Sequence, residues 1–277
     1  MQTLRDTLLV FENQLRFTFR YKITIVMGLV QPVLYLLLFG PLLTKLGDMG
    51  RPGDTWQTFV PGVLVYLALF GAGFCGFGII ADVRSGVIER LRVTPVSRFA
   101  LLMGRVIREV AVLLVQSVII IAVGLLLGLR ANVLGILSAV ILVVLLGTAL
   151  AALSLSLGVA LKSEDQFAPL LTSATLPIML LAGILLPMTL APTWLDVLSR
   201  INPLRYIVDA IRDLFADRFA TWAVLEGTAV SVVLAVVCVA VGHAHVRQGE
   251  RLRKTDVPAA GRPRARACAS PHTRPLR

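Results

Sequence analysis

The sequence predicts an all-α integral membrane protein with six transmembrane helices. Of its 277 residues, 57% are apolar and only 16% are charged, whereas a soluble domain carries roughly a quarter charged residues. Six stretches with almost no charge are each long enough, at roughly 20 residues, to cross a bilayer as a helix. Arginines concentrated between the second and third stretches indicate the cytoplasmic side. The six stretches lie near 23–43, 56–80, 108–129, 133–160, 167–187 and 220–242.

The distribution of basic residues among the loops predicts the topology. The N-terminal arm, the loop 82–109, the short loop at Lys162 and the C-terminal tail hold 20 of the 27 Lys and Arg residues. Because Lys and Arg near span ends resist export, both termini are expected in the cytoplasm. The first apolar run begins only at Ile23 and no cleavage site follows it, so no cleavable signal is predicted. We expect a multi-pass protein of the cell membrane.

The two ends of the chain are predicted to meet the membrane surface. In residues 1–22, apolar side chains recur every three or four positions, and basic residues lie between them. This pattern is typical of an amphipathic helix in the cytoplasmic interface, with a frayed tail as the alternative. Residues 247–277 are rich in Arg, Pro and Ala. They are expected to be a basic, disordered cytoplasmic tail attracted to anionic lipid.

The segment between the fifth and sixth spans has balanced charge and is expected on the extracellular side. Asn202 followed by Pro203 is typical of a helix start, with Asn as the cap and Pro in the first turn. The following residues form an apolar face and a polar face, and the polar face carries Arg205 and Asp209. We therefore expect a short interfacial or re-entrant helix here. Its expected interfacial anchors are Trp194, Tyr206 and Trp222.

Small residues recur at four-residue steps within the spans. Examples are Gly147 with Ala151 and Ser154 with Gly158, and Gly76 closes a similar series in the second span. Such stripes allow close approach of helices in lipid. The sequence leaves open whether they pack within the chain or between two copies.

No energy source for transport is evident in the chain itself. Ion-coupled carriers use ionisable groups near the bilayer midplane, and no such group is predicted there. Glu226 lies one helical turn after Trp222, so it is either an ordinary interfacial carboxylate or a polar contact at the outer mouth. The chain lacks the G-x-x-x-x-G-K-[ST] phosphate loop and any catalytic or metal-ligating grouping. We predict no enzyme activity, cofactor or metal site in this chain.

The loop 82–109 is the largest predicted polar surface. It carries six arginines against three acids. Residues 82–93 can form a helix, Pro95 disfavours helix at Thr94, and a second helix can then run into the third span. The expected result is a bent, charged elbow between two spans. Force on such an elbow would rotate both spans.

Two segments carry a resemblance to a known family. ERLRVTPVSRFALLMGR at 89–105 and INPLRYIVDAIRDLF at 201–215 resemble the membrane domains of type-2 ATP-binding-cassette exporters, most of all the permeases of daunorubicin-resistance-type drug exporters. The resemblance covers roughly residues 1–245. It implies two copies of this chain, each paired with a separate ATPase subunit that binds ATP and Mg. The residues it implies for the ATPase contact are Glu89, Arg90, Leu91, Arg92, Pro95, Ser97 and Arg98.

The resemblance also implies a substrate class, an amphipathic drug or secondary metabolite that is moved out of the cell. Two alternatives stay open: export of a lipid or lipid-linked glycan, and a non-transporting sensor or assembly component. Binding to nucleic acid is not expected, because orientation and contact with anionic headgroups account for the net charge of +11.

Overall fold

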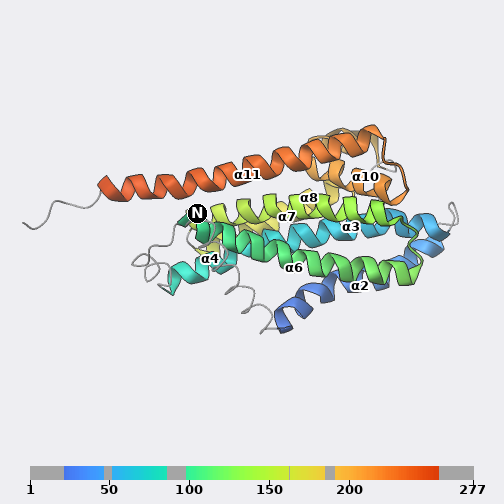
Figure 1. Ribbon diagram of the computed structural model, residues 1–277, viewed down its shortest axis with the longest axis horizontal. Helices are drawn as coiled ribbons and strands as arrows, with labels where there is room; N and C mark the ends of the chain where they lie inside the picture. The colour runs from blue at the N-terminus through green and yellow to red at the C-terminus, as the bar shows by residue number, and fades with distance from the viewer. Residues whose placement is uncertain (1–21, 47–51, 86–97, 162, 185–190, 256–277) are drawn as a thin grey trace, which may run out of the picture.

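The described part of the chain is entirely helical, as predicted. The structure, a computed structural model, describes residues 22–46, 52–85, 98–161, 163–184 and 191–255. Long helices lie side by side along one axis of the molecule (Figure 1). The helices are α2 (Lys22–Leu46), α3 (Pro52–Gly73), α4 (Cys75–Arg84), α6 (Arg98–Leu127), α7 (Val133–Leu161), α8 (Glu164–Leu181), α9 (Thr193–Ser199), α10 (Pro203–Phe215) and α11 (Trp222–Thr255).

Four helical segments in the described residues are long and apolar enough to cross a membrane. They coincide with the predicted second, third, fourth and sixth spans, and a shorter apolar stretch, Gly28–Leu42, coincides with the first. The predicted fifth span corresponds to α8, which contains Pro169 and Pro177 and is not among the four. The four segments are Thr55–Arg84, Met103–Leu127, Val133–Leu161 and Trp222–Gly242.

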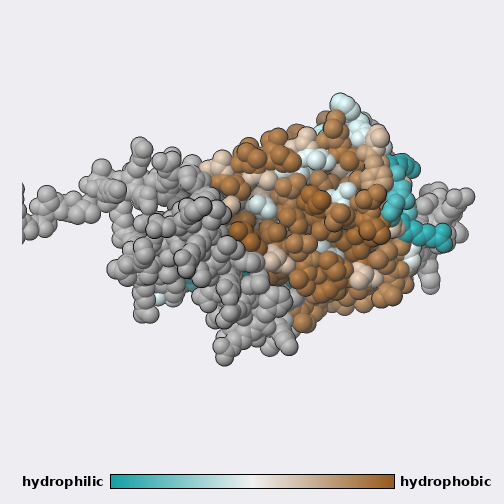
Figure 2. Space-filling view, viewed as in Figure 1, coloured by the Kyte–Doolittle hydropathy of each residue, from teal (hydrophilic) through white to brown (hydrophobic). Residues whose placement is uncertain are grey.

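The surface of the bundle is largely apolar, as expected for a protein that lies in a bilayer. Hydrophobic side chains cover the face seen in Figure 2, and hydrophilic residues gather at the end that carries α10. Many large apolar side chains of the described residues are exposed, such as Leu126 and Val133, which are 87% and 77% exposed. Exposed apolar surface of this extent is what a bilayer covers. The chain is a multi-pass membrane protein.

Helix α7 lies at the centre of the packing. It contacts α3, α4, α6, α8, α10 and α11. Its buried positions are dominated by small residues, including Gly147, Ala151, Ser154 and Gly158. Small side chains let neighbouring backbones approach from several directions. The predicted stripes on this helix therefore pack within the chain.

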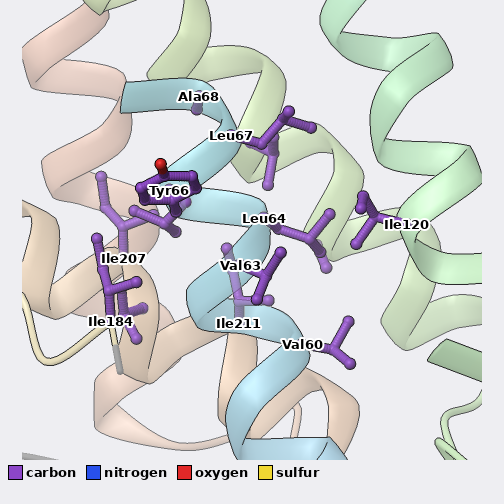
Figure 3. Packing of buried hydrophobic residues seen from close by; sticks show 14 of the residues in the cluster. Val60, Val63, Leu64, Tyr66, Leu67, Ala68, Ile120, Ile184, Ile207 and Ile211 are labelled. Carbon is purple, nitrogen blue, oxygen red and sulfur yellow. The ribbon is translucent and has the colours of Figure 1, made fainter. Parts of the chain in front are cut away.

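A hydrophobic core surrounds α3, which is buried on nearly all sides. Leu64 and Leu67 of α3 are almost inaccessible and lie near Ile120 of α6. Ile207 and Ile211 of α10 point into the same cluster (Figure 3). A helix that is apolar all round is expected to be enclosed by others. Helix α10 therefore packs against α3 as part of the bundle.

The predicted second span is two helices, α3 and α4, that meet at Phe74. The Ser154 hydroxyl of α7 donates to the Gly73 carbonyl oxygen and accepts a hydrogen bond from the Gly76 N–H at 2.8 Å. One hydroxyl thus satisfies two backbone groups at the break, as the membrane interior requires. A Cβ at Gly76 would lie 2.5 Å from Phe167 and from the Ser154 carbonyl oxygen. Glycine is required here by this close approach.

Two helices extend beyond the predicted boundaries. Helix α6 begins at Arg98, before the predicted third span near 108–129, and it contains no proline that would break it. Helix α11 continues to Thr255, into the tail that was expected to be disordered from residue 247. Residues 248–255 are mostly good helix formers, and the first proline after the start of α11 is Pro258, so the helix can continue. The predicted amphipathic helix over 1–22 falls almost wholly outside the described residues.

Candidate functional site

The ends of α4 and α6 that flank residues 86–97 carry a group of charged side chains within the bundle. We call Asp82, Arg105, Arg108 and Glu109 the α4–α6 charge cluster. Asp82 comes from α4 and the other three from α6. The sequence analysis placed all four in the polar loop 82–109, with Arg108 and Glu109 also at the start of the predicted third span. In the structure α4 and α6 extend over these residues and pack them against each other and against neighbouring spans.

An ion pair joins the two helices in this cluster. Arg105 Nη2 donates to Asp82 Oδ2, and the Arg105 side chain is only 8% exposed. Among the described residues, Arg105 Nε has no hydrogen-bond partner. The Asp82 side chain is 34% exposed, so the pair is only partly buried, and its loss should cost about 1–3 kcal/mol. The pair therefore holds the ends of α4 and α6 together at the entrance to residues 86–97.

Glu109 lies further along the same helix and inside the predicted bilayer. Its side chain is 13% exposed, and Arg108 Nη2 lies 3.9 Å from Glu109 Oε2. It lies against α3, where a Cβ at Gly71 would be 3.9 Å from Glu109 Oε1. With two acids and two arginines the cluster has no net charge. This balance favours a structural connection between helices over a pathway for ions.

A surface ion pair extends the connection to α8. Arg84 Nη1 lies 3.5 Å from Glu164 Oε1, and both side chains are about half exposed. Such pairs contribute about 0–1 kcal/mol. The pair nevertheless shows that the end of α4 and the start of α8 lie at the same end of the bundle.

The predicted ATPase-contact residues connect these helices. Glu89, Arg90, Leu91, Arg92, Pro95 and Ser97 lie outside the described residues. Arg98 is the first residue of α6, and its side chain is also outside the description. Sequence reasoning missed the pairing of Arg105 with Asp82. The signal available was an arginine and an aspartate at opposite ends of one loop.

At the other end of the bundle, α10 begins as the sequence predicted. Asn202 Oδ1 accepts a hydrogen bond from the Leu204 N–H at 3.1 Å, and Pro203 is the first helical residue. Asn202 Nδ2 also donates to the Ile178 carbonyl oxygen of α8 at 2.7 Å. The cap thus fixes both the start of α10 and its position against α8.

The polar face of α10 forms a chain of alternating charges with α9. Arg205 Nη2 lies 2.6 Å from Asp196 Oδ1, and Arg205 Nε lies 3.7 Å from Asp209 Oδ2. Arg200 Nη2 reaches the other oxygen of Asp196 at 2.9 Å. Hydrogen bonds from Arg200 and from Arg205 hold the pKa of Asp196 below its usual range.

Arg212 connects α10 to more distant parts of the chain. Its Nε donates to the Thr58 carbonyl oxygen of α3 at 3.1 Å, and its Nη2 donates to the Gly183 carbonyl oxygen at 2.7 Å. Its Nη1 also lies 3.2 Å from Asp209 Oδ1. The polar face of α10 therefore contacts backbone carbonyl groups of other segments.

Helix α10 is inserted into the bundle. Of the two predicted placements, interfacial or re-entrant, its contacts with α3, α7 and α11 favour the re-entrant one. At Gly227 of α11, a Cβ would lie 2.4 Å from Ala210 Cβ and 2.5 Å from the Tyr206 carbonyl oxygen. The two helices therefore touch through their backbones.

The remaining predicted residues of this region are peripheral. The Tyr206 hydroxyl donates to the Arg200 carbonyl oxygen at 3.0 Å. Trp194 and Trp222 are 68% and 71% exposed, which suits interfacial anchors. Glu226 is half-buried near the start of α11, and no hydrogen bond or ion pair joins it to another described residue. In the described part of the chain, no three His, Cys, Asp or Glu residues gather as metal ligands.

Comparison with known proteins gives one family and several relatives. A family model described as ABC-2 type transporter matches residues 6–216, a range that contains the charge cluster and α10. The chain is 28% identical over 201 residues to ycf38 of Cyanophora paradoxa, described as a transport permease, covering 71% of this chain and 69% of that protein. For ycf38 of Porphyra purpurea the identity is 26%, with coverage of 70% and 68%. DrrB1 of Streptomyces coeruleorubidus, a daunorubicin resistance ABC transporter permease protein, is 24% identical, with coverage of 70% and 69%.

Proposed function

Since the chain belongs to the ABC-2 type transporter family and is the permease component of an ATP-driven transporter, we propose that it moves an amphipathic drug or secondary metabolite out of the cell. The permease domain of this family has no ATPase activity and binds no cofactor. ATP and Mg therefore belong to a partner ATPase subunit. The similarity to a daunorubicin resistance permease supports the proposed substrate class.

The ion pair between Arg105 and Asp82 is the observation that carries the proposed mechanism. It joins α4 and α6 at the two ends of residues 86–97. A partner that displaces these residues therefore displaces both spans together. We infer that the ATPase subunit binds Glu89, Arg90, Leu91, Arg92, Pro95, Ser97 and Arg98. Helices α4 and α6 then carry the movement into the bilayer.

The proposed topology has six crossings, with α2 as the first and α8 as the fifth. The contact between Arg84 and Glu164 supports it, because it places the end of α4 and the start of α8 at one end of the bundle. Basic residues at that end favour the cytoplasm. Both termini are then cytoplasmic, and α10 and its residues Asn202, Arg205, Tyr206 and Asp209 are extracellular. Glu226 lies near the outer mouth.

We further propose a complex of two permease chains and two ATPase subunits in the cell membrane. The test is co-expression with the cognate ABC ATPase subunit, followed by reconstitution in inside-out vesicles. ATP should drive uptake of some compounds from a panel of lipophilic drugs, and an ATPase that cannot hydrolyse ATP should abolish it. A fluorescent phospholipid in the panel tests the lipid alternative. ATP-independent uptake by the permease alone would contradict the proposal.

A further inference from the structure

An apolar cleft of about 380 Å³ lies between α8 and α11, toward the end of the bundle that carries α9 and α10. Pro177 and Ile178 come from α8, and Leu234 and Cys238 come from α11. Residues of α3, α7, α9 and α10 complete the lining. The volume is within the range of small-molecule sites, roughly 300–1,000 Å³. The cleft belongs to neither the charge cluster nor the charge network of α9 and α10.

The chemistry of the lining excludes water as a stable occupant. Asn202 supplies the one polar amide, and both of its ends are already used, by the Leu204 N–H and the Ile178 carbonyl oxygen. A buried water needs two to four polar partners. An apolar group that fills this space gains dispersion contacts that an empty cleft lacks.

The shape and position of the cleft favour a flexible aliphatic chain. Its lining residues are aliphatic, proline, cysteine and asparagine, and no aromatic ring is among them. A planar aromatic compound would gain most from aromatic partners, which this cleft does not offer. Leu153, Ile178 and Leu198 at its edge are partly exposed on the apolar surface, where the bilayer lies. An acyl chain can enter from there without crossing water.

A cation for a headgroup lies beside the cleft. Arg200 directly precedes Ile201, a lining residue, and its side chain is 66% exposed. It contacts Asp196 through one carboxylate oxygen only, so several of its N–H groups are available. The charge network here holds three arginines and two aspartates, an excess of one positive charge. The network consists of Arg200, Asp196, Arg205, Asp209 and Arg212.

We propose that the cleft between α8 and α11 binds one acyl chain of a phospholipid whose phosphate lies at Arg200. The site requires only that the chain spans a bilayer. It holds whether or not the chain exports drugs.

Photolabelling of the full-length protein in nanodiscs tests the acyl-chain site. The probe is a phospholipid with a diazirine midway along one acyl chain, and labelled residues are mapped by mass spectrometry. Label is expected on the α8 and α11 lining residues. Leu234→Trp and, at the edge of the cleft, Leu153→Trp should each reduce this label at least fivefold. Val233→Trp, at an exposed position of α11, is the control and should retain it.

A second arm tests the headgroup contact. Arg200→Gln should reduce labelling by the phospholipid probe severalfold but leave labelling by an uncharged fatty-alcohol probe unchanged. Arg130→Gln, an exposed arginine in the turn between α6 and α7, is the matched control. Monodisperse elution of each variant establishes that it is folded, and Leu153→Trp keeps the test valid if Leu234→Trp does not fold.

Several outcomes would overturn the proposal. Even labelling over all apolar faces would show no site, as would wild-type labelling in Leu153→Trp and Leu234→Trp. Displacement of the lipid probe by a transported aromatic compound would assign the cleft to the substrate. Cysteine cross-links from Cys238, or from a Pro177→Cys variant, to a second copy of the chain would assign it to a protein interface. Failure of drug export in vesicles would leave the lipid result unaffected, so the two proposals fail separately.

Discussion

Arg105 of α6, whose side chain is buried, forms an ion pair with Asp82 of α4, and the pair joins the two helices that flank residues 86–97. Both residues come from a loop that the sequence alone would leave in water. The pair therefore determines how force on residues 86–97 reaches the spans.

Removal of one partner of this pair should destabilise the protein. Arg105→Gln leaves Asp82 without its cation, and a loss of about 1–3 kcal/mol is expected because the Asp82 side chain is partly exposed to solvent. The double variant Asp82→Asn with Arg105→Gln should lose less, because no charge is left unpaired. The measurement is unfolding of the purified permease in detergent. The exposed pair Arg84 and Glu164 is the control, and Glu164→Gln should cost at most about 1 kcal/mol.

Charge reversal at the proposed ATPase contact should uncouple the complex. Arg90→Glu combined with Arg92→Glu should abolish co-purification of the ATPase subunit and ATP-driven export, while membrane insertion stays normal. Arg130→Glu makes a similar change in the turn between α6 and α7 and should have no effect on co-purification. Normal recovery of the ATPase with the double variant would place the contact elsewhere.

The break between α3 and α4 gives a prediction with a neighbouring control. Gly76→Ala would bring a Cβ to 2.5 Å from the Ser154 carbonyl oxygen, so the helices must move apart. Overpacking of this kind costs about 1–3 kcal/mol. Gly78→Ala has open space around it and should be neutral or stabilise by up to about 1 kcal/mol. Equal melting temperatures for the two variants would show that the helices do not approach as described.

The break between α3 and α4 is also stabilised by the Ser154 hydroxyl group. Ser154→Ala should leave the Gly73 carbonyl and the Gly76 N–H without their partner. A cost of about 1–3 kcal/mol is expected for the unsatisfied groups. Ser154→Thr retains the hydroxyl and tests whether hydrogen bonding or space is limiting. Unchanged stability of Ser154→Ala would mean that other groups satisfy the break.

Asp196 should contribute to the acid dependence of unfolding. Its pKa in the folded protein lies below the ordinary value of about 3.9, because Arg200 and Arg205 donate hydrogen bonds to it. The stabilisation is therefore complete above the ordinary pKa and is lost as pH falls through the lowered folded value. Thermal unfolding between pH 7 and pH 2 should show a shallower acid dependence in Asp196→Asn than in wild type. Asp217→Asn, at an exposed position after α10, should keep the wild-type dependence.

The apolar helices and the start of α10 were determined by the sequence itself. A long apolar run in lipid must satisfy its backbone groups internally, so helix is its available structure. Asn202 and Pro203 act on the residues beside them, and their local preference was sufficient to fix the start of α10. The small-residue stripes could likewise be predicted as packing surfaces, because their spacing is local. The helix that packs against each stripe could not be predicted from that spacing.

Only the tertiary structure decided which residues meet across helices. Asp82 with Arg105, Ser154 with the break at Phe74, and Arg212 with the Thr58 carbonyl join positions far apart in the chain. Periodicity gives the faces of each helix but not the rotation and depth at which two helices pack. Those depend on side-chain volumes summed over the whole bundle. They determine whether an arginine between two spans lies in water or is buried beside an aspartate.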